Sequence, residues 1–528
     1  MNRLTELGFE TQVQEATRVR ARGDEAVAVT IRNLVGRRAG SASTGSLLLV
    51  AHYDSRALSP GAGDDATGVA VLLESLRAIQ AELPLANDLV VLLTDGEEFG
   101  LHGARAFAQD HPWMADVRLV LNVEMRGSGG PSLMFETGAD NGWIVDQLAQ
   151  ADPSPVANSL FVEIYRRLPN DTDFTAFVDA GRQGLNFAAI GRPENYHQAT
   201  DTPGNLQEAT VQHHGIRILS LVRHLGAADL TTVDAPDRSF LRIPMRGLVT
   251  PPTAWAWPLT LAVMGGVLLA VFLATLRGAR SRGIILGSVL SILAVAVAAA
   301  TGWLIFRWAA PMHEEVGALT PAFHDEGPYR FALAFLCLAF TVGLFEAARP
   351  WVRPLEASLG ALLLPTVVLA AMTLTAPGAA INLQLPLAAV VTLLLVLALM
   401  GPKRSRGMVA WILTLLLTLP VFLLLTPLVE LLGIALGMGA AAVLAGFITL
   451  GLLIVLPALE FLDTPNRWWA SLTALLCAAA GLGVGMLQAE PASERPAPST
   501  LIHVGRHRRP SSMRWPGART AHRTGPGG

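Results

Sequence analysis

The sequence predicts an α/β domain followed by a polytopic α-helical membrane domain. In the first part, short apolar runs at residues 46–51, 88–94 and 117–123 each end in polar or charged residues. Runs of this length, flanked by helical patterns, indicate buried parallel strands. In the second part, from residue 254 to residue 487, long uncharged runs rich in Leu, Ala and Val dominate the chain. The two parts therefore differ in fold and in surroundings, which are water for the first part and the lipid bilayer for the second.

Residues of metal-binding type follow each of the expected strands. His52 and Asp54 come after the first run, Glu97 and Glu98 after the second, and Glu124 after the third. In open α/β sheets, ligands bind in the crevice beyond the carboxyl ends of the strands. Two further pairs complete the ordered set, Asp64 with Asp65 and Tyr196 with His197. Taken singly, each of these residues is more often structural, but together they predict a site.

The residue types suit a pair of zinc ions. Zinc binds imidazole nitrogen and carboxylate oxygen, and two zinc ions roughly 3.5–4 Å apart can bind both the attacking and the departing group of a hydrolysis. Such a pair needs about five protein ligands, one of them a bridging carboxylate, and a free carboxylate for proton transfer. The available ligands are His52, Asp64, Glu98, Glu124 and His197, and Glu97 is left over as the base.

At these residues the chain resembles the aminopeptidase Y-type dizinc exopeptidases. The matching blocks are AHYDS (51–55), PGAGDDATGVA (60–70), TDGEEFGLHGA (94–104), NVEMRGSGG (122–130) and NYHQATDTPGN (195–205). Their order and spacing also match, over residues 2–230. The resemblance implies a zinc-exopeptidase-like fold, with a mixed, mainly parallel sheet flanked by helices, and two Zn²⁺ per chain.

The resemblance also implies how the ligands are shared. The implied metal ligands are Asp64 as the bridge, His52 and Glu124 on one zinc, and Glu98 and His197 on the other. Glu97 would be the general base. One departure is Glu124, where many soluble members carry Asp; this change keeps a carboxylate ligand.

Three further features follow from the same resemblance. Asp54 would not bind metal itself but would contact His52 and orient its ring, and such a contact fixes the tautomer of a ligating imidazole. Tyr196 is similar to the tyrosine of the family that donates a hydrogen bond to the developing oxyanion. The peptide after the bridging aspartate would be cis, which is the Asp64–Asp65 bond here.

Several polar residues near these motifs have no assigned role. Arg126 precedes a Gly-Ser-Gly-Gly turn and would either contact substrate or pair with a carboxylate, and the sequence leaves the two readings equal. The remaining histidines of this part match no ligand of the family and are expected on the surface or in helices; they are His102, His111, His213 and His214.

The apolar part contains eight candidate membrane spans. A span needs about 20 apolar residues, and the candidates are residues 254–276, 284–306, 331–345, 359–374, 383–400, 408–428, 432–456 and 468–487. The third and fourth are short, so we expect the third to extend through Arg330 or Glu346 and the fourth to extend back towards Leu355. A buried bundle of a water-soluble domain does not account for so many successive runs with few charges between them.

Basic residues predict the orientation of the spans. Arginines and one lysine cluster in the loops at 277–282, 349–353 and 403–406, and such loops mark the cytoplasmic side. The peptidase-like domain would then lie on the extracytoplasmic side. The Arg-rich tail conflicts with this orientation, because after eight spans it would also lie outside.

The expected domain boundaries are 1–230 for the dizinc peptidase domain, 231–253 for a linker, 254–488 for the membrane domain and 489–528 for a disordered tail. The net charge of −3 gives no sign of nucleic-acid binding, so the expected partners are a peptide substrate and the lipid bilayer, with the oligomeric state left open.

A peptidase followed by many spans resembles the membrane branch of the family, vacuolar membrane protease and endoplasmic reticulum metallopeptidase. Those proteins begin with a further span, whereas residues 1–38 contain no apolar run long enough for one. A start codon further upstream would explain the missing span. A frameshift near Ser499 would explain the tail, which is rich in Pro, Arg, Ser and Gly.

These observations predict a membrane-anchored zinc exopeptidase, with an aminopeptidase favoured. The alternative from another class is a non-catalytic receptor or scaffold built on a peptidase-like domain. Retention of the ligands and the base argues against this alternative. Carboxypeptidase or glutaminyl cyclase chemistry on the same fold also stays open, because substrate specificity depends on loops that the sequence does not interpret.

Overall fold

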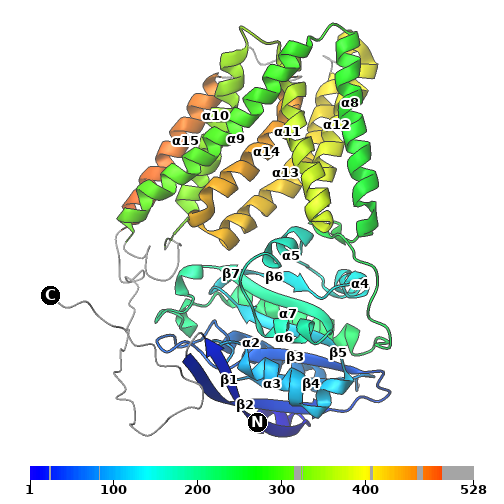
Figure 1. Ribbon diagram of the computed structural model, residues 1–528, viewed down its shortest axis with the longest axis vertical. Helices are drawn as coiled ribbons and strands as arrows, with labels where there is room; N and C mark the ends of the chain where they lie inside the picture. Colours follow the sequence, from blue (N-terminus) through cyan, green and yellow to red (C-terminus); the bar gives the residue numbers. More distant parts are fainter. Residues whose placement is uncertain are drawn as a thin grey trace, which may run out of the picture.

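A computed structural model describes residues 1–22, 25–81, 84–313, 323, 325–404, 408–460 and 468–489. The expected disordered tail at 489–528 therefore lies outside the described residues, except for Ala489. The chain folds into a sheet-containing part and a bundle of long helices, stacked end to end (Figure 1).

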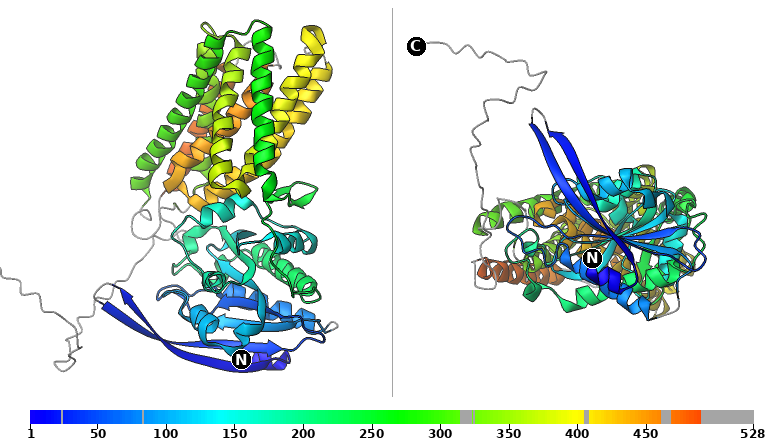
Figure 2. Two further views of the ribbon diagram at one scale, coloured as in Figure 1. Left: turned by 45° about the vertical axis from the view of Figure 1, so that its right-hand side comes forward. Right: turned by 90° about the horizontal axis from the view of Figure 1, so that it is seen from below.

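The first part is built on a sheet with the strand order β1-β2-β4-β3-β5-β7-β6. Its strands are β1 (Glu10–Arg22), β2 (Glu25–Arg38), β3 (Ser46–His52), β4 (Asp88–Thr94), β5 (Val117–Met125), β6 (Gly129–Thr137) and β7 (Gln183–Gly191). The central strands β4, β3, β5 and β7 are parallel, whereas β1, β2 and β6 pair antiparallel at the edges. The sheet is mixed, as predicted, and its parallel strands form the centre. The outer end of the β1–β2 hairpin projects beyond the rest of the sheet (Figure 2).

Helices cover both faces of the sheet because β3, β4 and β5 are apolar on both faces. Every residue of β3 and β4 is buried. On one face, Leu47 and Leu49 pack in a core with α2 (Ala66–Gln80), α4 (Gly142–Ala151) and α7 (Glu208–Leu225). On the other face, Leu48 and Val50 pack in a core with α3 (His102–Asp110) and α6 (Asp173–Asp179). Burial on both faces is the pattern of parallel strands.

Shorter elements complete this part of the chain. They are α1 (Asn2–Glu6), η1 (Pro112–Asp116), α5 (Ser159–Tyr165), η2 (Pro193–Asn195), η3 (Pro203–Asn205) and the β8 (Leu241–Ile243) and β9 (Gly247–Val249) ribbon. The helix α5 and the strand β6 lie on the side that faces the helical bundle (Figure 1).

The second part contains eight helical segments in the described residues that are long and apolar enough to cross a membrane. The helices are α8 (Ala256–Leu276), α9 (Ser281–Ala309), α10 (Gly327–Ala348), α11 (Pro354–Thr375), α12 (Ile381–Arg404), α13 (Met408–Leu436), α14 (Ala441–Glu460) and α15 (Trp468–Leu487). Short 3₁₀ turns adjoin them, η4 (Thr253–Trp255), η5 (Ala310–Met312), η6 (Pro377–Ala380) and η7 (Met438–Ala440). The third and fourth spans extend at both ends beyond the predicted apolar runs, because α10 includes Arg330 and Glu346 and α11 begins at Pro354.

The two parts share one apolar core. Leu133, Phe135 and Phe161 of the sheet-containing part are buried in the same cluster as Leu432 and Met438 of the bundle. Polar contacts flank this cluster, since Asn158 and Asn382 exchange hydrogen bonds of 2.7 and 3.0 Å through their side-chain amides. Ala188 and Ile190, near the carboxyl end of the parallel strand β7, belong to the same cluster, so this end of the sheet is close to the end of α13.

Candidate metal centre

The predicted ligands meet at the carboxyl edge of the parallel strands. His52 is the last residue of β3, and β4 ends at Thr94, directly before the turn that carries Glu97 and Glu98. Glu124 is the penultimate residue of β5. Because β3 and β4 pair in register from Ser46–Asp88 to His52–Thr94, these chain segments end side by side.

The ligand atoms form two groups that share Asp64. In the first, the Nε2 atom of His52 lies 3.0 Å from Oδ1 of Asp64 and 3.6 Å from Oε2 of Glu124. In the second, the Nε2 atom of His197 lies 3.0 Å from Oδ2 of Asp64 and 3.0 Å from Oε1 of Glu98. The two oxygens of Asp64 thus face opposite groups, as the two oxygens of a bridging carboxylate do. In each group the donor atoms lie within 4.8 Å of one another.

The donor set fits zinc. It consists of imidazole nitrogens and carboxylate oxygens, the ligands that zinc takes in hydrolases. Oε1 of Glu98 and Nε2 of His197 are buried and 3.0 Å apart, yet neither makes a hydrogen bond within the described residues. Buried polar atoms are normally hydrogen-bonded, so these two atoms are arranged as ligands for a cation.

Asp54 contacts His52, as expected, and its main chain makes the shorter of the two contacts. The Nδ1 atom of His52 lies 3.0 Å from the backbone carbonyl of Asp54 and 3.6 Å from its carboxylate. The Asp54 carboxylate instead accepts hydrogen bonds from the backbone N–H groups of Glu97 (3.1 Å) and Glu98 (3.2 Å). Asp54 therefore fixes the imidazole through its main chain and the Glu97–Glu98 turn through its side chain.

Asp201 fixes the backbone around the shared ligand. Its carboxylate accepts hydrogen bonds from the N–H groups of Gly63 (2.7 Å) and Asp64 (3.2 Å). The Asp64–Asp65 peptide is cis, as expected. Asp65 then begins α2 as its N-cap, accepting a hydrogen bond of 3.0 Å from the N–H of Gly68. The sequence motif around His197 contains Asp201, but nothing in its spacing indicated that it would bind the loop of Asp64.

A buried amide network supports Glu124. The side-chain amide of Asn122 donates to Oε1 of Glu124 at 3.1 Å and to Oδ1 of Asn186 at 3.0 Å. Asn186 in turn donates to Glu136 at 2.8 Å. Burial raises the pKa of the Glu136 carboxyl to about 7, although the hydrogen bond from Asn186 lowers it. These asparagines lie inside apolar strands, and sequence reasoning did not single them out.

Glu97 belongs to neither ligand group and lines the adjoining pocket. Burial raises the pKa of its carboxyl well above the ordinary value, and the negative charge of Glu124 adds to this effect. Burial likewise raises the pKa of Tyr196, with the surrounding carboxylates adding to it, so this phenol stays a hydrogen-bond donor. The ring of Tyr196 stacks on His197 with centroids 3.7 Å apart.

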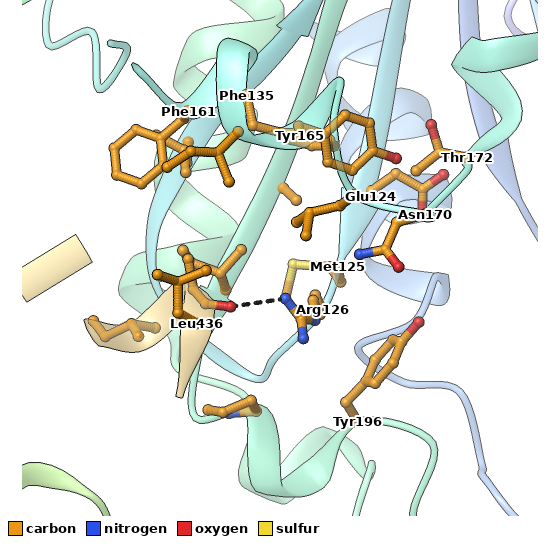
Figure 3. Close-up of a pocket in the computed structure, with 18 of the residues that line it drawn as sticks. Glu124, Met125, Arg126, Phe135, Phe161, Tyr165, Asn170, Thr172, Tyr196 and Leu436 are labelled. Atoms are coloured by element: carbon orange, nitrogen blue, oxygen red, sulfur yellow. Dashed lines mark hydrogen bonds between the residues drawn. The ribbon is translucent and has the colours of Figure 1, made fainter. Parts of the chain in front are cut away.

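The pocket has a volume of about 490 Å³ and lies between the two parts of the chain. Its polar end contains Asp64, Glu97, Glu124 and Tyr196. Its apolar side is formed by residues of α5 and β6, which include Phe135, Phe161, Ile164 and Tyr165. The end of α13 closes another side through Ile434, Ala435, Leu436 and Gly437 (Figure 3). Sequence analysis did not anticipate that a membrane helix would line this pocket.

The other histidines lie outside the two ligand groups. His102 begins α3, and His213 and His214 lie in α7, as expected for helix residues. His111 follows the end of α3 and is buried, so it is neither a surface nor a helix residue. Arg126 lines the pocket beside Glu124, and its Nη1 donates to the carbonyl of Ala435 at 3.1 Å (Figure 3).

Comparison with known proteins gives the family of this domain. Residues 33–222 match the model of Peptidase family M28. The chain contains an M28 peptidase domain. Mouse endoplasmic reticulum metallopeptidase 1 is 36% identical over 188 residues, which are 35% of this chain and 21% of that protein. Vacuolar membrane protease of Clavispora lusitaniae is 32% identical over 226 residues, which are 42% of this chain and 21% of that protein.

The matched region thus spans about a fifth of the length of these relatives. Among solved structures, the M28 domain is similar to an aminopeptidase from Aneurinibacillus sp. strain AM-1, at 20% identity and a TM-score of 0.33, over 40% of this chain and 52% of that one. It is also similar to Porphyromonas gingivalis glutaminyl cyclase, at 16% identity and a TM-score of 0.34, over 42% of this chain and 85% of that one.

Proposed function

We propose that the chain is a membrane-embedded dizinc exopeptidase that acts as an aminopeptidase. Its catalytic part would be residues 1–230, joined by a linker at 231–253 to a membrane domain at 254–488. The observation that carries the proposal is the shared carboxylate of Asp64, which has a histidine and a glutamate on each side while Glu97 stays free at the same pocket.

His52 and Glu124 would hold one Zn²⁺, Glu98 and His197 would hold the other, and Asp64 would contact both. When bound, two zinc ions lower the pKa of water and polarise a carbonyl oxygen. Two of the candidate ligands, Asp64 and Glu124, line the polar end of the pocket together with Glu97 and Tyr196. A peptide bond bound there would therefore lie beside both the base and the phenol.

Glu97 would move the proton. As a general base it takes a proton from the attacking water, and it then returns that proton to the leaving amine. Tyr196 would donate its phenolic hydrogen to the oxyanion that develops on the peptide carbonyl. Burial raises the pKa of this phenol, which favours the protonated form that donates. The apolar side of the pocket would exclude water and receive a substrate side chain.

The specificity for a free amine rests on the resemblance to aminopeptidase Y-type enzymes at the motifs around these residues. We test it with the purified full chain in detergent and zinc, offered the same peptides with a free and with an acetylated amino terminus. Hydrolysis of the free-amine peptides alone is expected. Equal hydrolysis of both, or release of the carboxyl-terminal residue from the blocked peptide, would contradict the aminopeptidase assignment.

The role of Glu97 has its own test. Glu97→Gln should keep both zinc ions but lose activity by about 10²–10⁴-fold, the usual contribution of a general acid–base group. Zinc content and rate are measured on the same sample, with Tyr196→Phe as a second variant that removes a donor and no ligand. Stoichiometric loss of metal in Glu97→Gln would show that Glu97 is a ligand.

The M28 domain would face the extracytoplasmic side. Arg277 and Arg353 lie in adjoining loops, since Arg353 donates to the carbonyl of Gly278 at 3.2 Å, and these loops are at the end of the bundle away from the M28 domain (Figure 1). Basic loops mark the cytoplasmic side. Reporters fused at Arg282 and at Ala227, in a chain given an upstream signal anchor, should give opposite compartments. A cytoplasmic signal at Ala227 would reverse the orientation.

A further inference from the structure

The pocket beside the metal centre contains one cation among the described residues that line it, Arg126. Arg126 follows directly after β5, two residues beyond the candidate ligand Glu124. Its side chain is exposed in the pocket (Figure 3). A guanidinium carries several N–H donors in a planar fork. The side chain of Arg126 makes only one hydrogen bond within the described residues, from Nη1 to the carbonyl of Ala435 at 3.1 Å.

That contact orients the guanidinium. Ala435 is in the last turn of α13, where carbonyl groups lack partners within the helix. A cation at a helix carboxyl terminus is stabilised by the helix dipole. The end of a membrane helix therefore holds the guanidinium at the pocket while most of its donors stay available.

A comparison with a second arginine separates this arrangement from a simple link between the two parts. Arg167 also donates to a carbonyl of the membrane bundle, that of Thr375, at 2.6 Å. The charge of Arg167 is paired with Glu163, at 2.6 Å. Arg126, in contrast, has no carboxylate within ion-pair distance in the part of the chain that the structure describes. A link between the parts explains the Ala435 hydrogen bond but not an unpaired cation in a substrate pocket.

We propose that Arg126 binds the carboxylate of the substrate's carboxyl terminus. The inference rests on the proposed peptidase function and adds a substrate class, which is short peptides with a free carboxylate. Arginine binds carboxylates through two parallel N–H···O hydrogen bonds, and the unpaired fork of Arg126 offers such a pair. The remaining charged groups that line the pocket are acidic, Asp64, Glu97, Glu124 and Asp171, so Arg126 is the group that can receive a carboxylate there.

The size of the pocket agrees with short peptides. A sphere with the volume of the pocket, about 490 Å³, would be about 10 Å across, and an extended residue spans about 3.3–3.6 Å. The pocket thus holds about two to three residues. The side chains of Phe135, Phe161 and Leu436 line it, so an apolar residue fits beside the scissile bond.

The test compares leucylglycine with leucylglycinamide, which differ only in the terminal carboxylate. Hydrogen bonds to a charged group correspond to about 10- to 100-fold in binding, so the full chain with zinc should show a kcat/KM ratio of acid to amide in this range. Arg126→Gln should reduce the ratio to about 1. Arg167→Gln is the matched control, because it removes an arginine-to-carbonyl link between the same two parts, and it should keep the ratio of the unmodified protein.

Two kinetic results would overturn the inference. The first is a ratio of about 1 in the unmodified protein, which needs no variant at all. The second is an Arg126→Gln variant that lowers both rates and keeps the ratio, as a purely structural role would. If neither peptide is hydrolysed, the proposed peptidase function fails, and calorimetric binding of the two peptides then decides about Arg126. Tighter binding of the acid that Arg126→Gln abolishes supports the inference, and equal binding contradicts it.

Discussion

Removal of the Asp201 carboxylate should weaken metal binding at both candidate sites, although Asp201 is not in either ligand group. Asp201 is 2% exposed, and its carboxylate accepts hydrogen bonds from the N–H groups of Gly63 and Asp64. Asp64 supplies one oxygen to each group of ligands. A shift of its backbone would therefore move a ligand of both sites at once.

The magnitude follows from these two hydrogen bonds. Asp201→Ala leaves two buried donors without an acceptor, and each unsatisfied donor costs about 1–3 kcal/mol. The expected local destabilisation is about 2–6 kcal/mol. Loss of a residue that orients metal ligands lowers metal affinity by about 10- to 100-fold. Asp201→Asn keeps one oxygen acceptor but replaces the other oxygen with an NH₂ donor. It therefore leaves one of the two N–H groups without an acceptor and should cost about 1–3 kcal/mol.

Two measurements separate folding from metal binding. Hydrogen exchange of residues 61–66 in chelator-treated protein reports the local stability without metal. Competition with a chelating dye reports the affinity for zinc. Ser59→Ala is the control, because the Ser59 hydroxyl lies 3.4 Å from the same carboxylate but leaves both of its oxygens in place. Gly61 is left out of this comparison, because its N–H donates to the Ser59 hydroxyl at 3.2 Å. Wild-type zinc affinity and unchanged exchange in Asp201→Ala would refute the positioning role.

Other expectations concern the ligands and the core. Asp64→Ala should lower zinc occupancy at both sites, whereas His197→Ala should empty mainly one; a single zinc per unmodified chain at saturating metal would contradict two sites. Burial, together with the charge of Arg217, lowers the pKa of His214 to about 3. Its contribution to stability is thus present above pH 6.5 and lost as the pH falls towards 3, so His214→Leu should flatten the acid side of a stability profile. Asp152→Ala should destabilise the M28 domain by about 3–5 kcal/mol, because it leaves the charge of Arg217 buried and unpaired; a loss below 1 kcal/mol in denaturant unfolding would contradict this.

The candidate ligands could be predicted from sequence because each one follows a recognisable apolar strand or lies in a short motif. His52, Glu98 and Glu124 are fixed by the ends of parallel strands, and parallel strands place those ends at one edge. Asp64 and His197 follow no strand of this kind; they were candidates by residue type and order, and the family resemblance supplied their roles. The eight spans were predictable for a similar reason, since length and hydropathy are local properties.

Contacts between distant segments could not be read in the same way. The hydrogen bonds of Asp201 join residues 138 and 137 positions apart, and the bond from Arg126 to Ala435 spans 309 positions. No local pattern encodes such pairs. For Asp54 the contact with His52 was identified but the atoms that make it were not, because the main chain and the side chain of one residue can both reach His52 and only geometry decides between them.

The division of the pocket between two parts of the chain predicts that metal binding and substrate selection can be separated. All candidate ligands lie before residue 230, so a fragment that ends before α8 should bind zinc in the same ratio as the full chain. The same fragment lacks Ile434–Gly437, and with them the carbonyl of Ala435 that orients Arg126. Its preference for a free carboxylate over an amide should fall well below that of the full chain, while a chain truncated after α15 should keep it. Zinc content and the acid-to-amide ratio are measured on the same preparations. A fragment that binds zinc and keeps the full preference would show that the end of α13 has no part in selecting the substrate.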